Sequence, residues 1–315
     1  EQARRQQARV AFAEGDTLRA IRAAVHLHED RIATPVLVGD EARVHAMAEE
    51  HGADIAGIEI VDPRVDDRRQ AFTQRLYELR ARHGLNVRNA ELKALRPRRF
   101  AMLMLDQEDV DCVVAGVNAT YPDAVRDALK IIGTNDCKAA ALHLIALKER
   151  TVFVADTSLN IEPTAEELCD IAITAADMAR TFDVTPRVAM LSFSTFGSVK
   201  HPAAQRVAQA VQMIHAKRPD LVVDGEMHVD VALSPAVAES LFPHSLIQGD
   251  ANVLICPDLS SANIGYKFLE YMAGGEVVGP ILLGMKKPVV VGYQSANAQT
   301  LVNLACIALA RGAAC

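Results

Sequence analysis

Residues 286 to 303 read KKPVVVGYQSANAQTLVN, and their order predicts the class of the fold. A proline opens a β-branched run, Val289 to Val291, and a glycine closes it before a helix-compatible stretch. This order predicts a buried strand, a turn and a helix. In open α/β sheets, ligands and catalytic groups collect at the turn after a strand's carboxyl end. The polar residues of this turn include no acid, base or cation: Tyr293, Gln294, Ser295 and Asn297.

Seven further apolar runs share this character. Most are rich in valine and are closed by Gly, Asp, Ser or Pro, and amphipathic helical stretches separate them. Continuous apolar strands are buried on both faces, as in parallel sheets. The sequence therefore predicts a doubly wound α/β fold. The runs are RVAFAE (9–14), PVLVG (35–39), CVVAG (112–116), TVFVAD (151–156), VAMLSFS (188–194), LVVDG (221–225) and NVLICPD (252–258).

The chain of 315 residues is long enough for two domains. We expect the boundary between the two domains near 136–150, because that stretch is expected to lie at the surface. The prediction is a first α/β domain over 1–140 plus 290–315 and a second over 141–289. The last helix, 299–312, would then return to the first domain.

Bulk composition excludes several classes of function. A net charge of -7 and a pI near 5.8 argue against a nucleic-acid partner, which would need a basic stripe. No apolar run reaches the roughly 18 residues of a membrane span, and no signal peptide opens the chain. Six scattered cysteines without a C-x-x-C pair fit reduced core residues of a cytoplasmic protein. The start at Glu1 suggests a domain cut from a longer polypeptide.

Two helix boundaries are well marked. Thr164 and Glu167 form a capping box after Pro163, because hydroxyl and carboxylate can satisfy the first N–H groups. Ser260 or Ser261 is expected to cap the helix that runs through Tyr266 to Tyr271. Gly274-Gly275 should end that helix.

Four polar stretches are candidate sites, each with an ordinary alternative. Asp224 to Asp230 places four potential metal ligands at alternate positions, although hydrogen bonding is favoured and a strand end is expected at Asp224. Ser192 to Ser198 suits an anion or a self-bonded turn equally. Arg126 suits an anion clamp or an ion pair with Asp123. The basic run 96–99 favours a solvated loop over an anion-binding edge. The sequence has no G-x-G-x-x-G or Walker loop and no Ser/His or Cys/His pattern.

Five stretches together resemble the phosphate acetyl/butyryl transferase family. The resemblance implies two doubly wound parallel-sheet α/β domains with a cleft between them. It also implies transfer of an acyl group between phosphate and coenzyme A: a base takes the thiol proton, the thiolate attacks the carbonyl, and cationic donors stabilise the oxyanion. The stretches are VVAG (113–116), FVADTSLNIEPTAEEL (153–168), VAMLSFSTFGS (188–198), PDLVVDGEMHVDVAL (219–233) and ANVLICPDLSSANIGYKFLEYMAGGEVVGPILLGMKKPV (251–289).

The opening turn departs from that family's pattern. In the active enzymes the turn after KPV reads approximately N-D-L-S-R-G, with an Asp separated from the Ser by some six residues. Here Tyr293, Gln294 and Thr300 stand at the Ser, Arg and Asp positions. A position often held by Cys falls on Thr157. We therefore assign no catalytic residue to this chain.

The resemblance is nearest to the C-terminal transacetylase-like domain of large bacterial NADP-dependent malic enzymes, through GMKKPV, SANIGYK and LVNLACIALA. It implies a domain that binds acetyl-CoA, inhibits malate oxidation at a distant active site and holds a homo-dimer or larger homo-oligomer together. NADP and a divalent metal would belong to the preceding catalytic portion. The expected acetyl-CoA-binding residues are Tyr121, Arg126, Thr157, Ser194, Gly197, Ser198, Asn263, Lys267, Tyr293, Gln294 and Asn297.

Two other functions remain open on the sequence. The chain could be an active phosphate acetyltransferase in which Asp258, Asp224 or Glu226 replaces the missing base. It could also be a structural dimerisation module that has lost coenzyme A binding.

Overall fold

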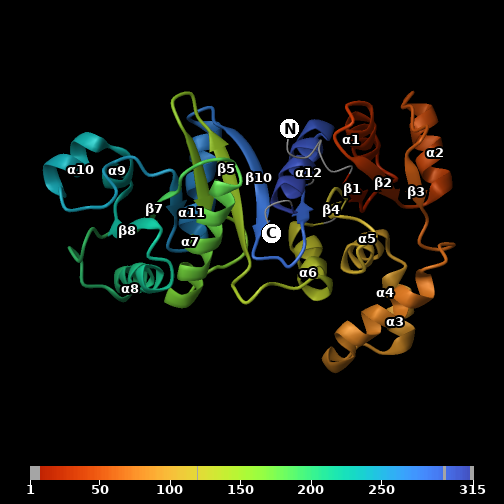
Figure 1. Cartoon of the computed structure of the whole chain (residues 1–315), viewed down its shortest axis with the longest axis horizontal. Helices are drawn as coiled ribbons and strands as arrows, with labels where there is room; N and C mark the ends of the chain where they lie inside the picture. The colour runs from red at the N-terminus through yellow and green to blue at the C-terminus, as the bar shows by residue number, and fades with distance from the viewer. Residues whose placement is uncertain (1–7, 119, 294–295, 313–315) are drawn as a thin grey trace. The chain divides into compact units, whose positions relative to one another are not determined.

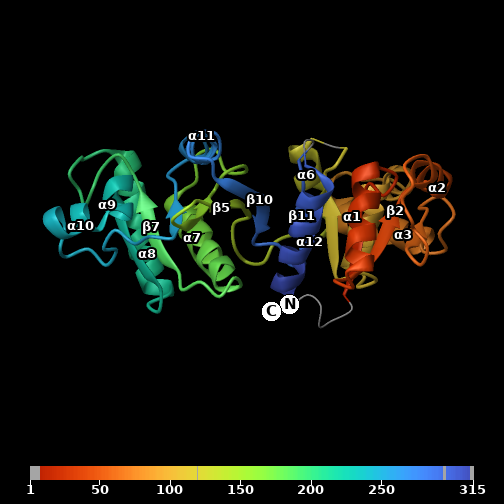
Figure 2. The same ribbon diagram turned by 90° about the horizontal axis from the view of Figure 1, so that it is seen from above.

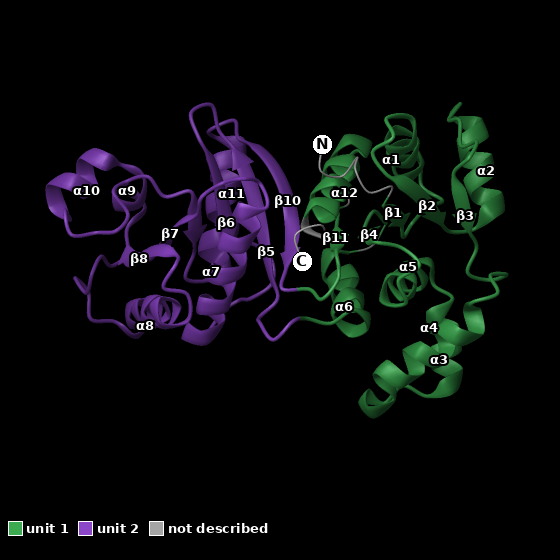
Figure 3. Cartoon of the chain, in the orientation of Figure 1, with its two compact units in different colours: residues 1–134, 285–315 green, residues 135–284 purple. Residues whose placement is uncertain are grey.

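The computed structural model describes residues 8–118, 120–293 and 296–312. The chain divides into two compact units, residues 1–134 with 285–315 and residues 135–284 (Figure 3). The boundaries predicted from the sequence, near 140 and 290, lie several residues further along the chain. The first unit is therefore built from both ends of the sequence.

The first unit contains a parallel sheet of five strands in the order β11-β4-β1-β2-β3. From β1 the chain proceeds through β2 to β3 on one side, and then returns to place β4 on the other side. The strand order therefore reverses between β1 and β4. The strands are β1 (Arg9–Phe12), β2 (Thr34–Val38), β3 (Glu59–Val61), β4 (Cys112–Ala115) and β11 (Val289–Val291).

Helices cover both faces of this sheet. The first and last helices of the unit, α1 and α12, lie side by side and share one apolar core with Val10 and Phe12 (Figures 1 and 2). Figure 1 shows α5 and α6 on the other side of the sheet. The helices are α1 (Leu18–Glu29), α2 (Glu41–Glu50), α3 (Arg69–Arg80), a 3₁₀ turn (Ala81–His83), α4 (Val87–Ala94), α5 (Pro97–Asp106), α6 (Tyr121–Ile131) and α12 (Ala298–Gly312).

The second unit contains a mixed sheet of six strands in the order β10-β5-β6-β9-β7-β8. Strands β6, β9, β7 and β8 are parallel, whereas β5 pairs antiparallel with both β6 and β10. The strands are β5 (Ala140–Ala146), β6 (Thr151–Ala155), β7 (Arg187–Leu191), β8 (Val222–Met227), β9 (Val253–Ile255) and β10 (Glu276–Leu283).

Of the two helix starts predicted in the second unit, one is confirmed and the other has a different capping residue. Thr164 and Glu167 form the predicted capping box of α7. The cap predicted at Ser260 or Ser261 is wrong, because the carboxylate of Asp258 accepts from the Ser261 amide and starts α11. The helices are α7 (Ala165–Arg180), α8 (Pro202–Lys217), α9 (Val229–Leu233), α10 (Pro235–Leu241) and α11 (Leu259–Tyr271).

All eight predicted strands are present, and three others were not predicted. One of these, β5, occupies the stretch expected to be a surface seam, and its residues 140–143 are buried. Another, β10, contains Gly279-Pro280, where its pairing with β5 shifts register. Because a Gly-Pro pair normally marks a turn or the end of a strand, the sequence pattern did not predict this strand.

No helix in the described ranges is long and apolar enough to cross a membrane.

Candidate functional site

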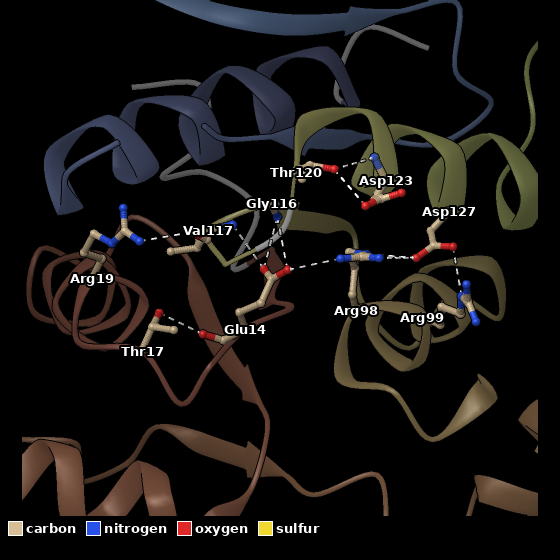
Figure 4. A network of polar contacts seen from close by, with 10 residues as sticks. All are labelled: Glu14, Thr17, Arg19, Arg98, Arg99, Gly116, Val117, Thr120, Asp123 and Asp127. Carbon is tan, nitrogen blue, oxygen red and sulfur yellow. Dashed lines mark hydrogen bonds and ion pairs between the residues drawn. The ribbon is translucent and has the colours of Figure 1, made fainter. Parts of the chain in front are cut away.

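A buried carboxylate lies where the strand order of the first unit reverses. Glu14 follows β1 and is 9% exposed. Its Oε2 accepts hydrogen bonds from the amides of Gly116 at 3.1 Å and Val117 at 3.4 Å, directly after β4 (Figure 4). Gly116 has φ +89, and a Cβ there would lie 2.8 Å from the carbonyl oxygen of Gly292. Glycine is therefore needed at position 116, where the residues after β4 lie close to those after β11.

The environment of Glu14 shifts the pKa of its carboxyl upward. Burial raises the pKa of the Glu14 carboxyl, while Arg98 and the two amide donors partly oppose that effect. Glu14 was not predicted from the sequence. The available signal was an acid followed by glycine immediately after a strand, a pattern too common to identify a site.

The basic run 96–99 is not the solvated loop that the sequence favours. Pro97 begins α5, and the guanidinium groups of Arg98 and Arg99 both bind the carboxylate of Asp127 on α6. Asp127 is buried, and the two arginine side chains are 20% and 19% exposed. Arg98 also reaches to 4.0 Å from Glu14, so one chain of charges joins β1, α5 and α6 (Figure 4).

The amino end of α6 lies beside this network. Thr120 caps the helix by accepting from the Asp123 amide, and Tyr121 is its first residue. Arg126 forms an exposed ion pair with Asp123 at 2.7 Å. Arg126 therefore forms the ion pair with Asp123 that the sequence offered as the alternative to an anion clamp.

The described part of the turn after β11 holds only neutral side chains. Tyr293 is 37% exposed. Asn297 Oδ1 accepts from the amide and the hydroxyl of Thr300, and so caps α12. Gln294 lies outside the described residues. Within residues 292–293 and 296–300, no side chain is an acid, a base or a cation.

The corresponding strand ends of the second unit hold a compact polar cluster. Thr157 follows β6 and is fully buried; its hydroxyl donates to the carbonyl oxygen of Ala141 at 3.1 Å and lies 2.8 Å from Nδ1 of His143. The Asn263 amide donates to the backbone oxygen of Thr157 at 3.2 Å. Thr157 and Asn263 are among the residues expected from the family resemblance, whereas His143 was not predicted and lies in the unpredicted strand β5.

Hydrogen-bond donors in the loop after β7 bind a buried carboxylate of the same unit. Glu226 Oε1 accepts from the Ser194 hydroxyl and from the Gly197 amide, each at 2.8 Å. Ser194 and Glu226 are buried, and Ser198 Oγ accepts from the Thr195 amide. The Ser194 hydroxyl and the Gly197 amide, both in the stretch considered for anion binding, therefore already bind the carboxylate of Glu226.

The stretch from Asp224 to Asp230 does not continue as a strand. Strand β8 passes through Asp224, where the sequence analysis wrongly placed its end, and stops at Met227. Asp224 accepts from the Ser245 hydroxyl and the Leu246 amide. Across the described ranges, no three His, Cys, Asp or Glu side chains gather as a metal site would need.

The chain matches the family described as "Phosphate acetyl/butaryl transferase" over residues 1–309. The chain belongs to this family. The phosphate acetyltransferase of Bacillus subtilis is 37% identical over 96% of the chain and 94% of its own length. The NADP-dependent malic enzyme of Rhizobium meliloti is 39% identical over 98% of the chain, which spans 41% of that enzyme. A solved phosphotransacetylase from Streptococcus pyogenes has a TM-score of 0.95 at 30% identity, covering 99% of the chain and 95% of the solved chain.

The likeness to the solved S. pyogenes phosphotransacetylase confirms the fold of two α/β sheets. The residues expected to bind acetyl-CoA, as far as the structure describes them, form two groups, one in each unit, and every one follows the carboxyl end of a strand that pairs in parallel. In the first unit they are Tyr121, Arg126, Tyr293 and Asn297. In the second they are Thr157, Ser194, Gly197, Ser198, Asn263 and Lys267.

Proposed function

We propose that this member of the phosphate acetyl/butyryl transferase family binds acetyl-CoA without transferring its acetyl group. The observation that carries the proposal is the turn after β11. Tyr293 and Thr300 stand where the resemblance expects a Ser and an Asp, and Thr300 bonds the helix cap Asn297. A missing general base commonly costs a factor of 10² to 10⁴ in rate.

Binding is supported by cationic groups that remain exposed at the strand ends. Arg126 presents a partly exposed guanidinium in the second turn of α6, and Lys267 presents an exposed ammonium on α11. Guanidinium and ammonium groups are the usual protein partners of phosphates such as those of coenzyme A. Each of these residues offers a cation to a phosphate in its own unit, and neither supplies a base for the thiol.

A binding site without a base can serve as a sensor. A ligand that binds one conformation 1–3 kcal/mol more tightly than another regulates a coupled site. We infer that acetyl-CoA is the ligand, that the chain acts within a homo-oligomer, and that the regulated activity is malate oxidation by a malic enzyme catalytic domain of the same polypeptide. NADP and a divalent metal would act in that domain.

A second candidate is an active phosphate acetyltransferase, and the comparisons favour it. The relatives matched over nearly their whole length, such as the B. subtilis enzyme, are phosphate acetyltransferases. This candidate needs a substitute base, and each acid considered for that role is already engaged. Asp258 caps α11, Asp224 binds Ser245, and Glu226 binds Ser194. A substitute base would therefore require rearrangement.

Turnover separates the two candidates. The chain is mixed with acetyl phosphate and coenzyme A, and acetyl-CoA formation is followed at the thioester absorbance. We expect no turnover above a no-protein control, together with saturable acetyl-CoA binding. Robust turnover that disappears in Asp258→Asn, Asp224→Asn or Glu226→Gln would establish the transferase instead.

Regulation needs its own measurement. Where the chain is encoded behind a malic enzyme catalytic region, acetyl-CoA should lower malate oxidation by the whole protein. Inhibition that persists after this chain is deleted would show that the sensor lies elsewhere.

A further inference from the structure

A cavity of about 120 Å³ lies in the first unit, where α3 and α4 pack beside α5 and α6 (Figure 1). It is larger than a single buried water molecule needs. Neither candidate function uses it. The titratable side chains of its wall come from four helices and the 3₁₀ turn: Arg80, His83, Lys93, Arg99, Asp127 and Lys130.

Cations outnumber carboxylates in this wall. Of the described residues that line the cavity, Asp127 alone is a carboxylate, and Arg98 and Arg99 already share it (Figure 4). The other charged side chains are two arginines and two lysines. Like charges gathered around one space repel each other, and an anion between them offsets that repulsion. The excess of positive charge therefore favours an anion with more than one negative charge.

The hydrogen-bond donors of this wall are largely unused. Arg99 Nε donates to Asp127 at 2.9 Å, whereas Arg99 Nη1 is buried and has no acceptor among the described residues. Within residues 8–118, 120–293 and 296–312, the side chains of Arg80, Lys93 and Lys130 form neither an ion pair nor a hydrogen bond. The wall therefore keeps donors for an acceptor that the described protein does not supply.

Arginines nearby in the sequence are treated differently. Arg64, Arg68 and Arg75 each bind the carboxylate of an aspartate, at 3.0 Å or less. This part of the unit thus provides acidic partners for arginines outside the cavity. The unpaired cations of the cavity are consistent with a place kept for an anion from outside the chain.

The charge and the size of the cavity indicate a phosphate group. Guanidinium and ammonium groups are the usual protein partners of phosphates. A phosphate monoester carries nearly two negative charges near neutral pH, whereas a carboxylate carries one. A cavity enclosed by five elements suits a compact group. A nucleic acid would instead need a long basic stripe, which the net charge of -7 argues against.

We propose that this cavity binds a phosphate group through Arg80, Lys93 and Lys130, with Arg99 held in place by Asp127. A free phosphate or pyrophosphate and a phosphate ester of a nucleotide share this chemistry, and competition between them identifies the source. The proposal does not rest on the binding of acetyl-CoA, because neither Arg126 nor Lys267 lines the cavity.

The test uses pyrophosphate as the probe, titrated by calorimetry into three proteins. The cavity variant is Lys93→Gln with Lys130→Gln. Its matched control is Arg22→Gln with Arg88→Gln, which removes two exposed cations of the same unit that do not line the cavity. All four side chains are exposed, so the fold should be retained.

We expect the wild type and the control to bind pyrophosphate with the same affinity. The cavity variant should bind at least about tenfold more weakly, because two charge-assisted contacts are lost. No saturable binding to the wild type at millimolar pyrophosphate, or equal affinity in all three proteins, overturns the proposal.

Thermal unfolding separates ligand binding from a purely structural role. A ligand that binds the folded state raises the unfolding temperature. Saturating pyrophosphate should raise it in the wild type and the control, and much less in the cavity variant. A variant that is less stable without the probe, yet gains as much from it as the wild type, would show that the two lysines only support the fold.

Repeating the titrations with adenosine 3′,5′-bisphosphate and acetyl-CoA identifies the source of the phosphate. Weakening of these ligands in the cavity variant, with competition against pyrophosphate, supports a nucleotide phosphate. Unchanged affinities for them support a free anion. Wild-type protein that binds pyrophosphate but not acetyl-CoA removes the proposed function alone. Wild-type protein that binds acetyl-CoA, with no effect of the cavity variant on any of the three ligands, removes this inference alone.

Discussion

The Glu14 carboxylate lies 3.1 Å from the amide nitrogen of Gly116 and so joins the end of β1 to the end of β4. These two strands are neighbours in the sheet but about a hundred residues apart in the chain. The contact lies where the strand order reverses, which is where doubly wound sheets bind their ligands. Glu14 therefore shapes the loop from which α6 starts.

Replacing Glu14 tests this role. Glu14→Ala leaves two buried amides without an acceptor, so the free energy of unfolding should fall by about 1–3 kcal/mol. Glu14→Gln keeps an acceptor oxygen and should cost clearly less. Urea denaturation of both variants measures the difference. Equal losses would show that the amide contacts contribute little.

The buried carboxylate of Asp127 should matter more than an exposed one. Asp127→Asn leaves Arg98 and Arg99 without their shared counter-charge and should cost about 3–5 kcal/mol. The matched control is Asp123→Asn, which breaks the exposed pair with Arg126 and should cost at most about 1 kcal/mol. The denaturation midpoints of both variants are compared with that of the wild type. Equal shifts of the two midpoints would contradict the prediction.

The pKa of His143 predicts how stability depends on pH. The folded-state pKa, about 4, lies below the ordinary value of 6.5. Between these values the unfolded chain binds more protons, so stability falls as pH drops from 6.5 to 4. The loss from this residue is on the order of 3 kcal/mol.

The control for this pH dependence is His143→Phe. Urea denaturation at pH 7, 6, 5 and 4 should show a shallower decline for this variant than for the wild type. The two curves should run parallel above pH 7. If stability declined in parallel for both proteins over the whole pH range, the pKa of His143 would not be lowered in the folded state.

Strand identity was predictable wherever burial on both faces left a continuous apolar run. The eight runs from RVAFAE to PVVVG all became strands. The exceptions have physical causes: β5 carries a histidine beside Thr157, and β10 contains Gly279-Pro280 at a shift in register. Strand β3 has only three residues, too few to show a period.

The candidate site was predictable only where function leaves a local pattern. Ser194 could be found because it follows a strand, whereas Asn263, inside α11, was expected only from the family resemblance. Glu14 and His143 could not be found, and Glu226 was considered only as a metal ligand or a base, because each acts through a partner remote in sequence. The contact between Glu226 and Ser194 spans 32 positions. Such pairings exist only in the folded chain.

One calorimetric experiment tests the central claim that the chain binds acetyl-CoA but does not transfer the acetyl group. Acetyl-CoA is titrated into the protein twice, without phosphate and with phosphate at millimolar concentration. We predict the same saturable isotherm in both, with the heat of each injection returning to baseline. Continuous heat in the phosphate titration alone would reveal transfer, and no binding heat at millimolar acetyl-CoA would remove the ligand; either result contradicts the account.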